Sequence, residues 1–150
     1  DLHSFPTRRS SDLAILVQRF PLVIGLDYSI LCNMYYPQQV YNCWRNYVMT
    51  YWLQQFHPTV VPNAGFGDKD TFPWTLDGMP EDSWISVTTQ GCFDNYILKH
   101  IFLNGLHELV RQKHPKGIIV YGLFPQEWID KFPIPIIIFP SYSQNRWGGI

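Results

Sequence analysis

The sequence has few charged residues, and their charges nearly cancel. Charged side chains make up 15% of the 150 residues, and 11 Lys and Arg against 12 Asp and Glu give a formal net charge of −1. Binding to nucleic acid or to anionic lipid relies on clustered positive charge, so the composition gives no evidence for direct nucleic-acid binding. Apolar residues make up 46% of the chain, and this high share excludes intrinsic disorder.

Cysteines and long apolar runs are scarce as well. The three cysteines, Cys32, Cys43 and Cys92, form no Cys-x-x-Cys motif, which argues against the disulfide framework of a secreted protein and against a zinc site. No apolar run reaches the ~18 residues of a membrane span, and neither a nucleotide-binding glycine fingerprint nor a Gly-x-Ser-x-Gly motif occurs. We therefore expect a cytoplasmic globular protein without a membrane-spanning helix or a metal site, with its cofactors unknown.

Residues 1–13 have neither helical nor strand periodicity. They resemble the translation of a short-read sequencing adaptor, a contaminant of assembled metagenomic genes. Arg8 and Arg9 followed by residues 13–17 imitate a signal peptide, but that apolar run is shorter than the ~7–15 residues such a signal needs. We expect residues 1–13 to be an artefact with almost no packed contacts, Phe5 included. Residues 14–150 are then a single α/β domain that lacks its N-terminal part.

Short segments rich in valine and isoleucine run through the rest of the chain. They are Leu22–Leu26, Thr59–Pro62, Trp84–Thr88, Gly117–Tyr121 and Ile134–Phe139. Nearly continuous apolar runs of this kind are typical of parallel strands that are covered on both faces. Helical patterns fit residues 37–56, residues 96–114 after a cap at Asp94 or Asn95, and residues 126–132. This order predicts an α/β fold: a mainly parallel sheet of about five strands with flanking helices, open or partly barrel-like.

The helix expected at residues 37–56 is apolar around most of its circumference, so we predict that it is largely buried. The residues behind this prediction are Val40, Trp44, Tyr47, Tyr51 and Trp52. Asn42, Arg45 and Asn46 form one polar stripe on the same helix. A buried arginine needs a partner, and we predict that Arg45 pairs with Asp27 or shares one polar pocket with it. Solvent exposure and recognition of an anion are the alternatives for Arg45.

Polar residues follow several of the predicted strands. Parallel sheets bind ligands outside the carboxyl ends of their strands, so these residues are the candidates for a site. Asp27 is the candidate catalytic residue, because burial at the end of an apolar strand raises the pKa of a carboxyl group and suits it to acid–base work. The alternative is that Asp27 only turns the chain or caps backbone amides. The candidate binding residues are Ser29, Arg45, Asn63, Asp77, Thr89, Gln90 and Tyr121.

An ordered set of motifs resembles the domain-of-unknown-function family 4417, uncharacterised proteins of bacteria, phages and plasmids. The motifs are Val23-Ile-Gly-Leu-Asp-Tyr-Ser29, Tyr41-Asn-Cys-Trp-Arg-Asn-Tyr47, Tyr51-Trp-Leu-Gln54, Val60-Val-Pro-Asn63, Leu76-Asp-Gly-Met-Pro80, Thr88-Thr-Gln-Gly91, Asn104-Gly-Leu106 and Ile118-Ile-Val-Tyr-Gly122. The similarity spans about Val17 to Pro140, and it implies a further strand and an acidic motif upstream. The chain departs from the family pattern at Leu26, where a proline is usual, and at residues 64–67, where a tryptophan is common.

The resemblance implies no reaction, so two functions remain open beside a purely structural role. The first is an enzyme of the hydrolase or transferase type that uses a carboxylate in a polar crevice at the strand ends. The second is a non-catalytic module of a phage or mobile-element protein that binds a small ligand or another protein in the same crevice. Two or more carboxylates that converge on one cavity would favour the enzyme, and an exposed apolar patch would favour the binding module.

Overall fold

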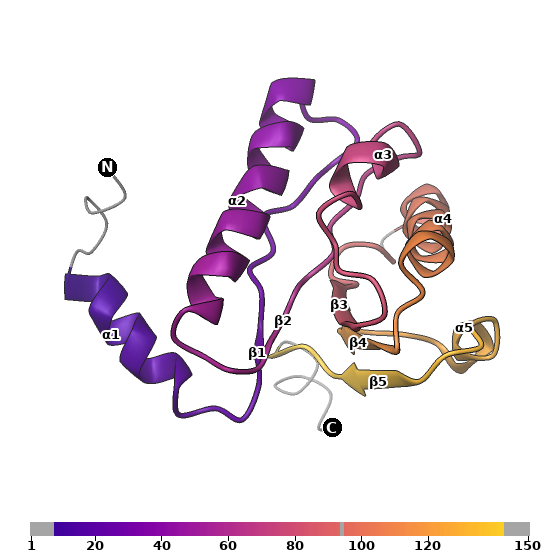
Figure 1. Ribbon diagram of the computed structural model, residues 1–150. Coiled ribbons are helices and arrows are strands. Elements are labelled where there is room, and N and C mark those ends of the chain that lie inside the picture. Colours follow the sequence, from indigo (N-terminus) through magenta and orange to yellow (C-terminus); the bar gives the residue numbers. More distant parts are fainter. Residues whose placement is uncertain (1–7, 94, 143–150) are drawn as a thin grey trace.

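The computed structural model describes residues 8–93 and 95–142, where helices and strands alternate (Figure 1). In chain order the elements are α1 (Arg8–Val17), β1 (Val23–Ile24), α2 (Tyr36–Gln54), β2 (Val60–Val61), α3 (Phe72–Thr75), β3 (Trp84–Thr88), α4 (Tyr96–Lys113), β4 (Gly117–Tyr121), α5 (Gln126–Ile129) and β5 (Ile136–Phe139). The expected α/β fold is confirmed. The expectation for Phe5 lies outside the described residues.

Every strand pair in the described part is parallel. β1 pairs with β2 in one sheet, and β4 lies between β3 and β5 in a second sheet. A single parallel bridge between Asn63 and Ser86 joins the two sheets, since the backbone N–H of Ser86 donates to Pro62 and that of Ala64 donates to Ser86. The strands therefore follow one another in chain order across two open sheets, and the prediction of a mainly parallel, open arrangement is confirmed.

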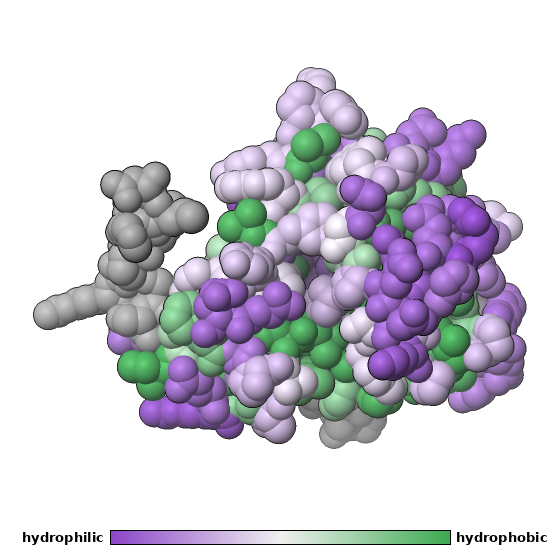
Figure 2. Space-filling view, in the orientation of Figure 1, coloured by the Kyte–Doolittle hydropathy of each residue, from purple (hydrophilic) through white to green (hydrophobic). Residues whose placement is uncertain are grey.

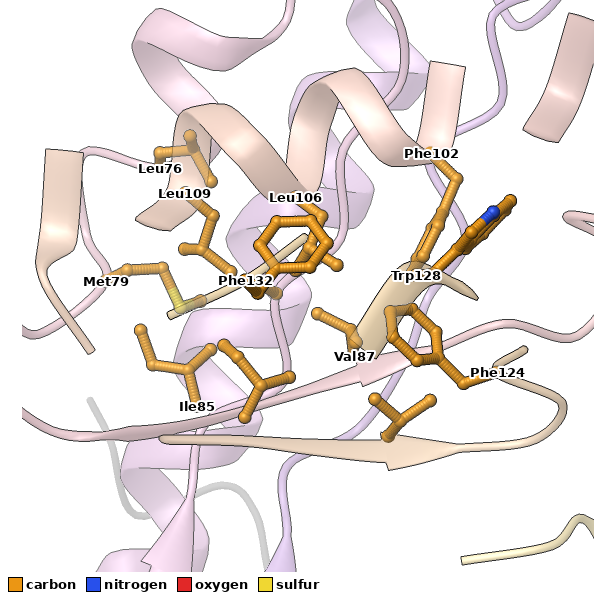
Figure 3. Packing of buried hydrophobic residues seen from close by; sticks show 13 residues of the cluster. Leu76, Met79, Ile85, Val87, Phe102, Leu106, Leu109, Phe124, Trp128 and Phe132 are labelled. Carbon is orange, nitrogen blue, oxygen red and sulfur yellow. The ribbon is translucent and has the colours of Figure 1, made fainter. Parts of the chain in front are cut away.

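The hydrophobic core lies between the sheet of β3 and β4 and the helices α4 and α5 (Figure 3). Its most deeply buried side chains are Leu76, Ile85, Val87, Leu106, Leu109, Ile118, Val120 and Trp128. Full burial of one such side chain contributes about 1.5–3 kcal/mol. This half of the domain is therefore held together mainly by apolar packing.

The ends of the elements follow their sequence signals. Asn95 caps α4, because its side-chain oxygen accepts a hydrogen bond of 2.9 Å from the Leu98 N–H, while the alternative Asp94 lies outside the described residues. His114 ends α4 in the left-handed conformation (φ 45°), directly before Pro115. A proline is compatible with an edge strand or with the first residues of a strand, so Pro135 favours one of these two positions for the last strand. β5 begins at Ile136, directly after Pro135, and it pairs with β4 alone in the described part.

Two helices differ from expectation. α1 begins at Arg8, so it includes part of the segment 1–13 for which no helix was expected. The run of good helix formers at residues 13–17 extends upstream there without a proline or glycine. The short α3 was not predicted either; Pro73 stands in its first turn, where a missing N–H costs nothing. The adaptor origin of residues 1–13 stays a prediction.

The prediction that α2 is largely buried is wrong: among the residues behind it, Tyr47 and Trp52 are half-buried and the others are exposed. Trp44 is 55% and Tyr51 is 67% exposed, and Val40 is exposed as well. The buried residues of α2 are Gln39, Asn42, Cys43, Asn46, Thr50 and Leu53. The polar stripe thus faces inward, because it supplies hydrogen bonds to a loop whose backbone forms no helix or strand. No helix in the described part combines the length and the apolarity needed to cross a membrane.

Candidate functional site at the carboxyl ends of the strands

Two pockets open at the edge where the parallel strands end at their carboxyl termini. The larger one, which we call the edge pocket, has a volume of about 540 Å³ and is lined by Ile30, Leu31, Cys32, Asn33, Phe66, Gly67, Gln90, Gly91, Cys92, Leu98, Ile101 and Phe102. The smaller one, of about 290 Å³, is lined by Thr89, Gln90, Gly91, Phe93, Gly122, Leu123 and Ser141. Gln90 and Gly91 line both, so the segment after β3 separates the two hollows.

The lining of the edge pocket is mainly apolar. Its polar side chains are the amides of Asn33 and Gln90 and the thiols of Cys32 and Cys92, and no carboxylate contributes to its wall. Burial raises the pKa of Cys32, and the nearby Asp68 raises it further, so this thiol stays protonated and a poor nucleophile. A volume of about 540 Å³ falls in the range of roughly 300–1,000 Å³ that small-molecule sites occupy.

A glycine in the middle of α4 shapes one wall of the edge pocket. A Cβ atom on Gly105 would overlap the ring of Phe66, so the absence of a side chain lets that ring lie directly against the helix backbone. Phe66 also contacts the rings of Phe72 and Phe102, with centroid distances of 6.1 and 5.9 Å. Glycine costs a helix interior about 1 kcal/mol relative to alanine. Here it fixes the position of Phe66.

The polar stripe of α2 fixes the loop after β1, which forms another wall. Asn46 accepts a hydrogen bond of 2.7 Å from the N–H of Tyr28 and donates one of 3.0 Å to its carbonyl oxygen. Asn42 donates to the carbonyl oxygen of Ser29 at 2.7 Å. Gln39 donates to the carbonyl oxygen of Leu31 at 2.8 Å. These contacts hold residues 28–31 in one conformation and present Ile30 and Leu31 to the pocket.

The predicted pairing of Asp27 with Arg45 is wrong. No ion pair joins the two side chains within residues 8–93 and 95–142. The half-buried guanidinium of Arg45 instead lies 3.8 Å from the ring centroid of Tyr28 and 4.8 Å from that of Tyr41, and it donates to the side chain of Asn42. Two aromatic faces and an amide oxygen thus take the place of the expected carboxylate.

Asp27 follows the carboxyl end of β1 and is exposed to solvent. The surrounding protein atoms raise its pKa above the ordinary value, and a hydrogen bond with the Thr88 side chain lowers it by a smaller amount. The net direction agrees with the expectation for a carboxyl group at this position. Asp27 lines neither pocket. Gly65 lies between the Asp27 carboxyl group and Ile30, which lines the edge pocket. Its catalytic role stays a prediction.

Three other predicted site residues serve the structure of the strand ends. Asn63 is 2% exposed, and its side-chain oxygen lies 3.2 Å from the Ser86 hydroxyl, which also contacts a carbonyl oxygen. Thr89 is buried, and its N–H donates to the carbonyl oxygen of Tyr121 at 3.0 Å. The Tyr121 hydroxyl in turn accepts from the N–H of Tyr142. Of the predicted binding residues, Gln90 and Thr89 line a pocket.

Asp77 is one of the predicted binding residues, but it lies away from both pockets. It lies in the connection that leads into β3, and its carbonyl oxygen accepts a hydrogen bond of 3.3 Å from Lys113 at the end of α4. α4 ends where β4 begins, so Asp77 lies at the amino ends of the strands, opposite the pockets. The described residues include no group of three or more His, Cys, Asp or Glu that could hold a metal ion.

Parallel strands in chain order, with two pockets at their carboxyl ends, define an open, parallel α/β domain. The chain belongs to the family described as Domain of unknown function (DUF4417), whose profile matches residues 7–142. This confirms the family that the motifs indicated.

Two phage proteins are similar to the chain. One is the Gene 1 protein of Mycobacterium phage L5, with 29% identity over 97% of this chain and 64% of the relative. The other is the Gene 1 protein of Mycobacterium phage D29, with 28% identity over 97% of this chain and 54% of the relative. The chain thus spans between about half and two thirds of the length of these relatives. No solved structure matches the chain.

Proposed function

We propose that this chain is a ligand-binding domain whose edge pocket takes a small, mainly apolar molecule. The observation that carries the proposal is the pocket itself: about 540 Å³ at the carboxyl ends of β1, β2 and β3, lined by apolar side chains with two amide groups among them. Small-molecule sites in parallel α/β domains share this position and this kind of lining.

The lining also limits the chemistry of the ligand. No charged side chain lines the edge pocket, and an unpaired charge buried against apolar walls is costly. The part of the ligand inside the pocket is therefore neutral. The rings of Phe66 and Phe102 offer faces for a planar or branched apolar group, and the side chains of Asn33 and Gln90 supply the few polar contacts that orient it.

A second candidate function is an enzyme that uses Asp27 as an acid or base. The raised pKa of Asp27 and its position one glycine away from the pocket wall favour this function. A substrate seated in the edge pocket would have to extend past Ile30 and Gly65 to reach the carboxyl group. The absence of any carboxylate from the pocket wall makes the binding module the better supported proposal.

A neutral fluorescent dye such as Nile red tests the proposed binding. We expect saturable one-to-one binding to the intact chain. Leu31→Asp should weaken it by about tenfold or more, because Leu31 lines the pocket and is 49% exposed, so the change adds a charge without opening the core. The control is Ile97→Asp on α4, 68% exposed and outside the pocket, which should leave the affinity unchanged. Equal affinities of all three proteins would contradict the proposal.

We also propose a cytoplasmic location within cells that carry the phage or mobile element. Cys32 and Cys43 are free thiols, which is the usual state in a reducing compartment.

A further inference from the structure

α2 presents an uncovered aromatic face on the flank of the domain, away from α4 and α5 (Figure 1). This α2 face consists of Tyr36, Val40, Tyr41, Trp44, Val48 and Tyr51, all of which are exposed. Tyr41 stacks on Trp44 with a centroid distance of 5.7 Å and an angle of 19° between the rings. In Figure 2 the surface over α2 is mainly pale or green, whereas strongly hydrophilic residues gather over α4.

The composition of the α2 face is that of a protein interface. Tyrosine, tryptophan and arginine are the residues that dominate binding energy at interfaces, and lysine and acidic residues are depleted there. Between Tyr36 and Gln54 the only charged residue is Arg45, and its guanidinium is already covered by two tyrosine rings. At about 200 Å² per aromatic side chain, the four exposed rings alone present on the order of 500 Å².

We propose that the α2 face binds the same face of a second copy of this chain. Tyr41, Trp44, Val48 and Tyr51 follow the alternating three- and four-residue spacing along which two helices pack in a coiled-coil seam. The face is neutral, so a twofold axis opposes no like charges, and a charged partner would find nothing complementary. The exposed area is somewhat more than half of the ~800 Å² that one partner buries in a standard interface, which fits a reversible dimer.

The paired face and the edge pocket lie on opposite sides of α2. The side chains of Gln39, Asn42 and Asn46 point inward to the loop that forms the pocket wall, whereas Trp44 and Tyr51 point outward. Pairing through the outward face therefore leaves the pocket open. It also covers the helix that positions the loop, so the dimer supports the pocket without contributing a residue to it.

Analytical ultracentrifugation of the whole chain tests the pairing. We expect a reversible dimer of twice 17.6 kDa at micromolar concentration. The double variant Trp44→Lys, Tyr51→Lys should be a monomer, because the axis would bring lysines together. Tyr96→Lys, Ile97→Lys is the matched control, since both residues are more than two thirds exposed but lie at the start of α4. It should remain a dimer.

Circular dichroism and dye binding keep the result interpretable. Both double variants should retain the helical spectrum and the Nile red affinity of the original chain, so a loss of dimer cannot be mistaken for unfolding or for loss of the pocket. The milder Trp44→Gln, Tyr51→Gln serves if the lysine variant does not fold, and it should weaken the dimer by about tenfold or more. A monomeric original chain, or a folded face variant that dimerises as tightly as the original, would overturn the proposal.

Discussion

The two halves of this domain are held together in different ways. In the half built from β3, β4 and α4, the strands are five residues long, and Ile85, Val87 and Val120 are completely buried beneath the helix. In the half built from β1, α2 and β2, each strand has two residues, and α2 buries amide side chains that bond to a loop. The first half depends on apolar packing, and the second depends on specific hydrogen bonds.

An apolar helix pattern therefore does not by itself decide which face of a helix is buried. A loop without regular structure leaves backbone N–H and carbonyl groups that need partners when they are covered. Asn42 and Asn46 supply those partners, so the polar face of α2 turns inward and its aromatic face is left exposed. The site is assembled where the two halves meet, at the carboxyl ends of their strands.

The largest effect that we predict separates the halves directly. Leu106→Ala removes a completely buried side chain from the core, so it should lower the free energy of unfolding by about 2–5 kcal/mol. Trp44→Ala removes a larger side chain from the exposed face of α2, and it should cost only about 1 kcal/mol in the monomer, chiefly through the lost stacking on Tyr41. Urea denaturation at a concentration that favours the monomer measures both. Similar losses of stability in both variants would contradict the difference between the two halves.

Removal of a buried amide should have the next largest effect. Asn46→Ala deletes both hydrogen bonds to the backbone of Tyr28 and leaves its N–H and carbonyl without these partners. We expect a loss of about 2–3 kcal/mol, together with faster hydrogen exchange of the Tyr28 amide. Asn104→Ala on the exposed side of α4 is the control and should change stability by less than about 0.5 kcal/mol. Unchanged exchange at Tyr28 would refute the role given to Asn46.

Gly105→Ala tests the contact between the core and the pocket wall. The added Cβ must displace the Phe66 ring, which should cost about 1–3 kcal/mol, partly offset by ~1 kcal/mol of helix propensity. Dye binding should weaken as the wall moves. In the double variant Gly105→Ala, Phe66→Leu the smaller side chain makes room, so part of the stability should return. A Gly105→Ala protein that is more stable and binds dye normally would contradict the proposed packing.

Asp27→Asn should raise the free energy of unfolding slightly, whereas the substitutions above lower it. The protein atoms around Asp27 raise the pKa of the folded carboxyl group, so the folded state holds its proton more tightly than the unfolded state. Its contribution to stability is then present below the unfolded pKa and is lost as pH rises through the folded value. The variant should therefore be slightly more stable than the original chain at pH ~7 and no more stable below the ordinary Asp pKa of ~3.9. Urea melts at both pH values check this, and a clear loss of stability at neutral pH would contradict it.

The smallest effect concerns the start of the chain. We predict that deleting residues 1–7 leaves the melting temperature unchanged, since their sequence shows no pattern that matches a core. The family profile begins at residue 7. Deleting residues 1–17 should lower the melting temperature, because Ala14 and Val17 of α1 are buried. A large effect of deleting residues 1–7 would refute the prediction that residues 1–13 are an artefact.

The sequence predicted the strands, the ends of α4 and the start or edge position of β5 because each carries a local signal: an apolar run, a capping asparagine, a proline. It failed where the answer depends on distant partners. Nothing near Arg45 in the sequence shows that the ring of Tyr28 would cover it. Asp77 resembled a site residue by its motif, although it precedes a strand instead of following one. The pocket wall at Phe66 had one signal, the glycine in the middle of a helix.

Amide NMR spectra recorded during titration with a small neutral aromatic ligand test most directly whether the edge pocket is a binding site. We predict saturable shift changes that cluster at Leu31, Gly67, Gln90, Gly91 and Leu98, which line the pocket from three loops and α4. The changes should be absent in Leu31→Asp and present in Ile97→Asp. Changes confined to the outer face of α2, or no saturable change with any such ligand, would contradict the assignment of the site.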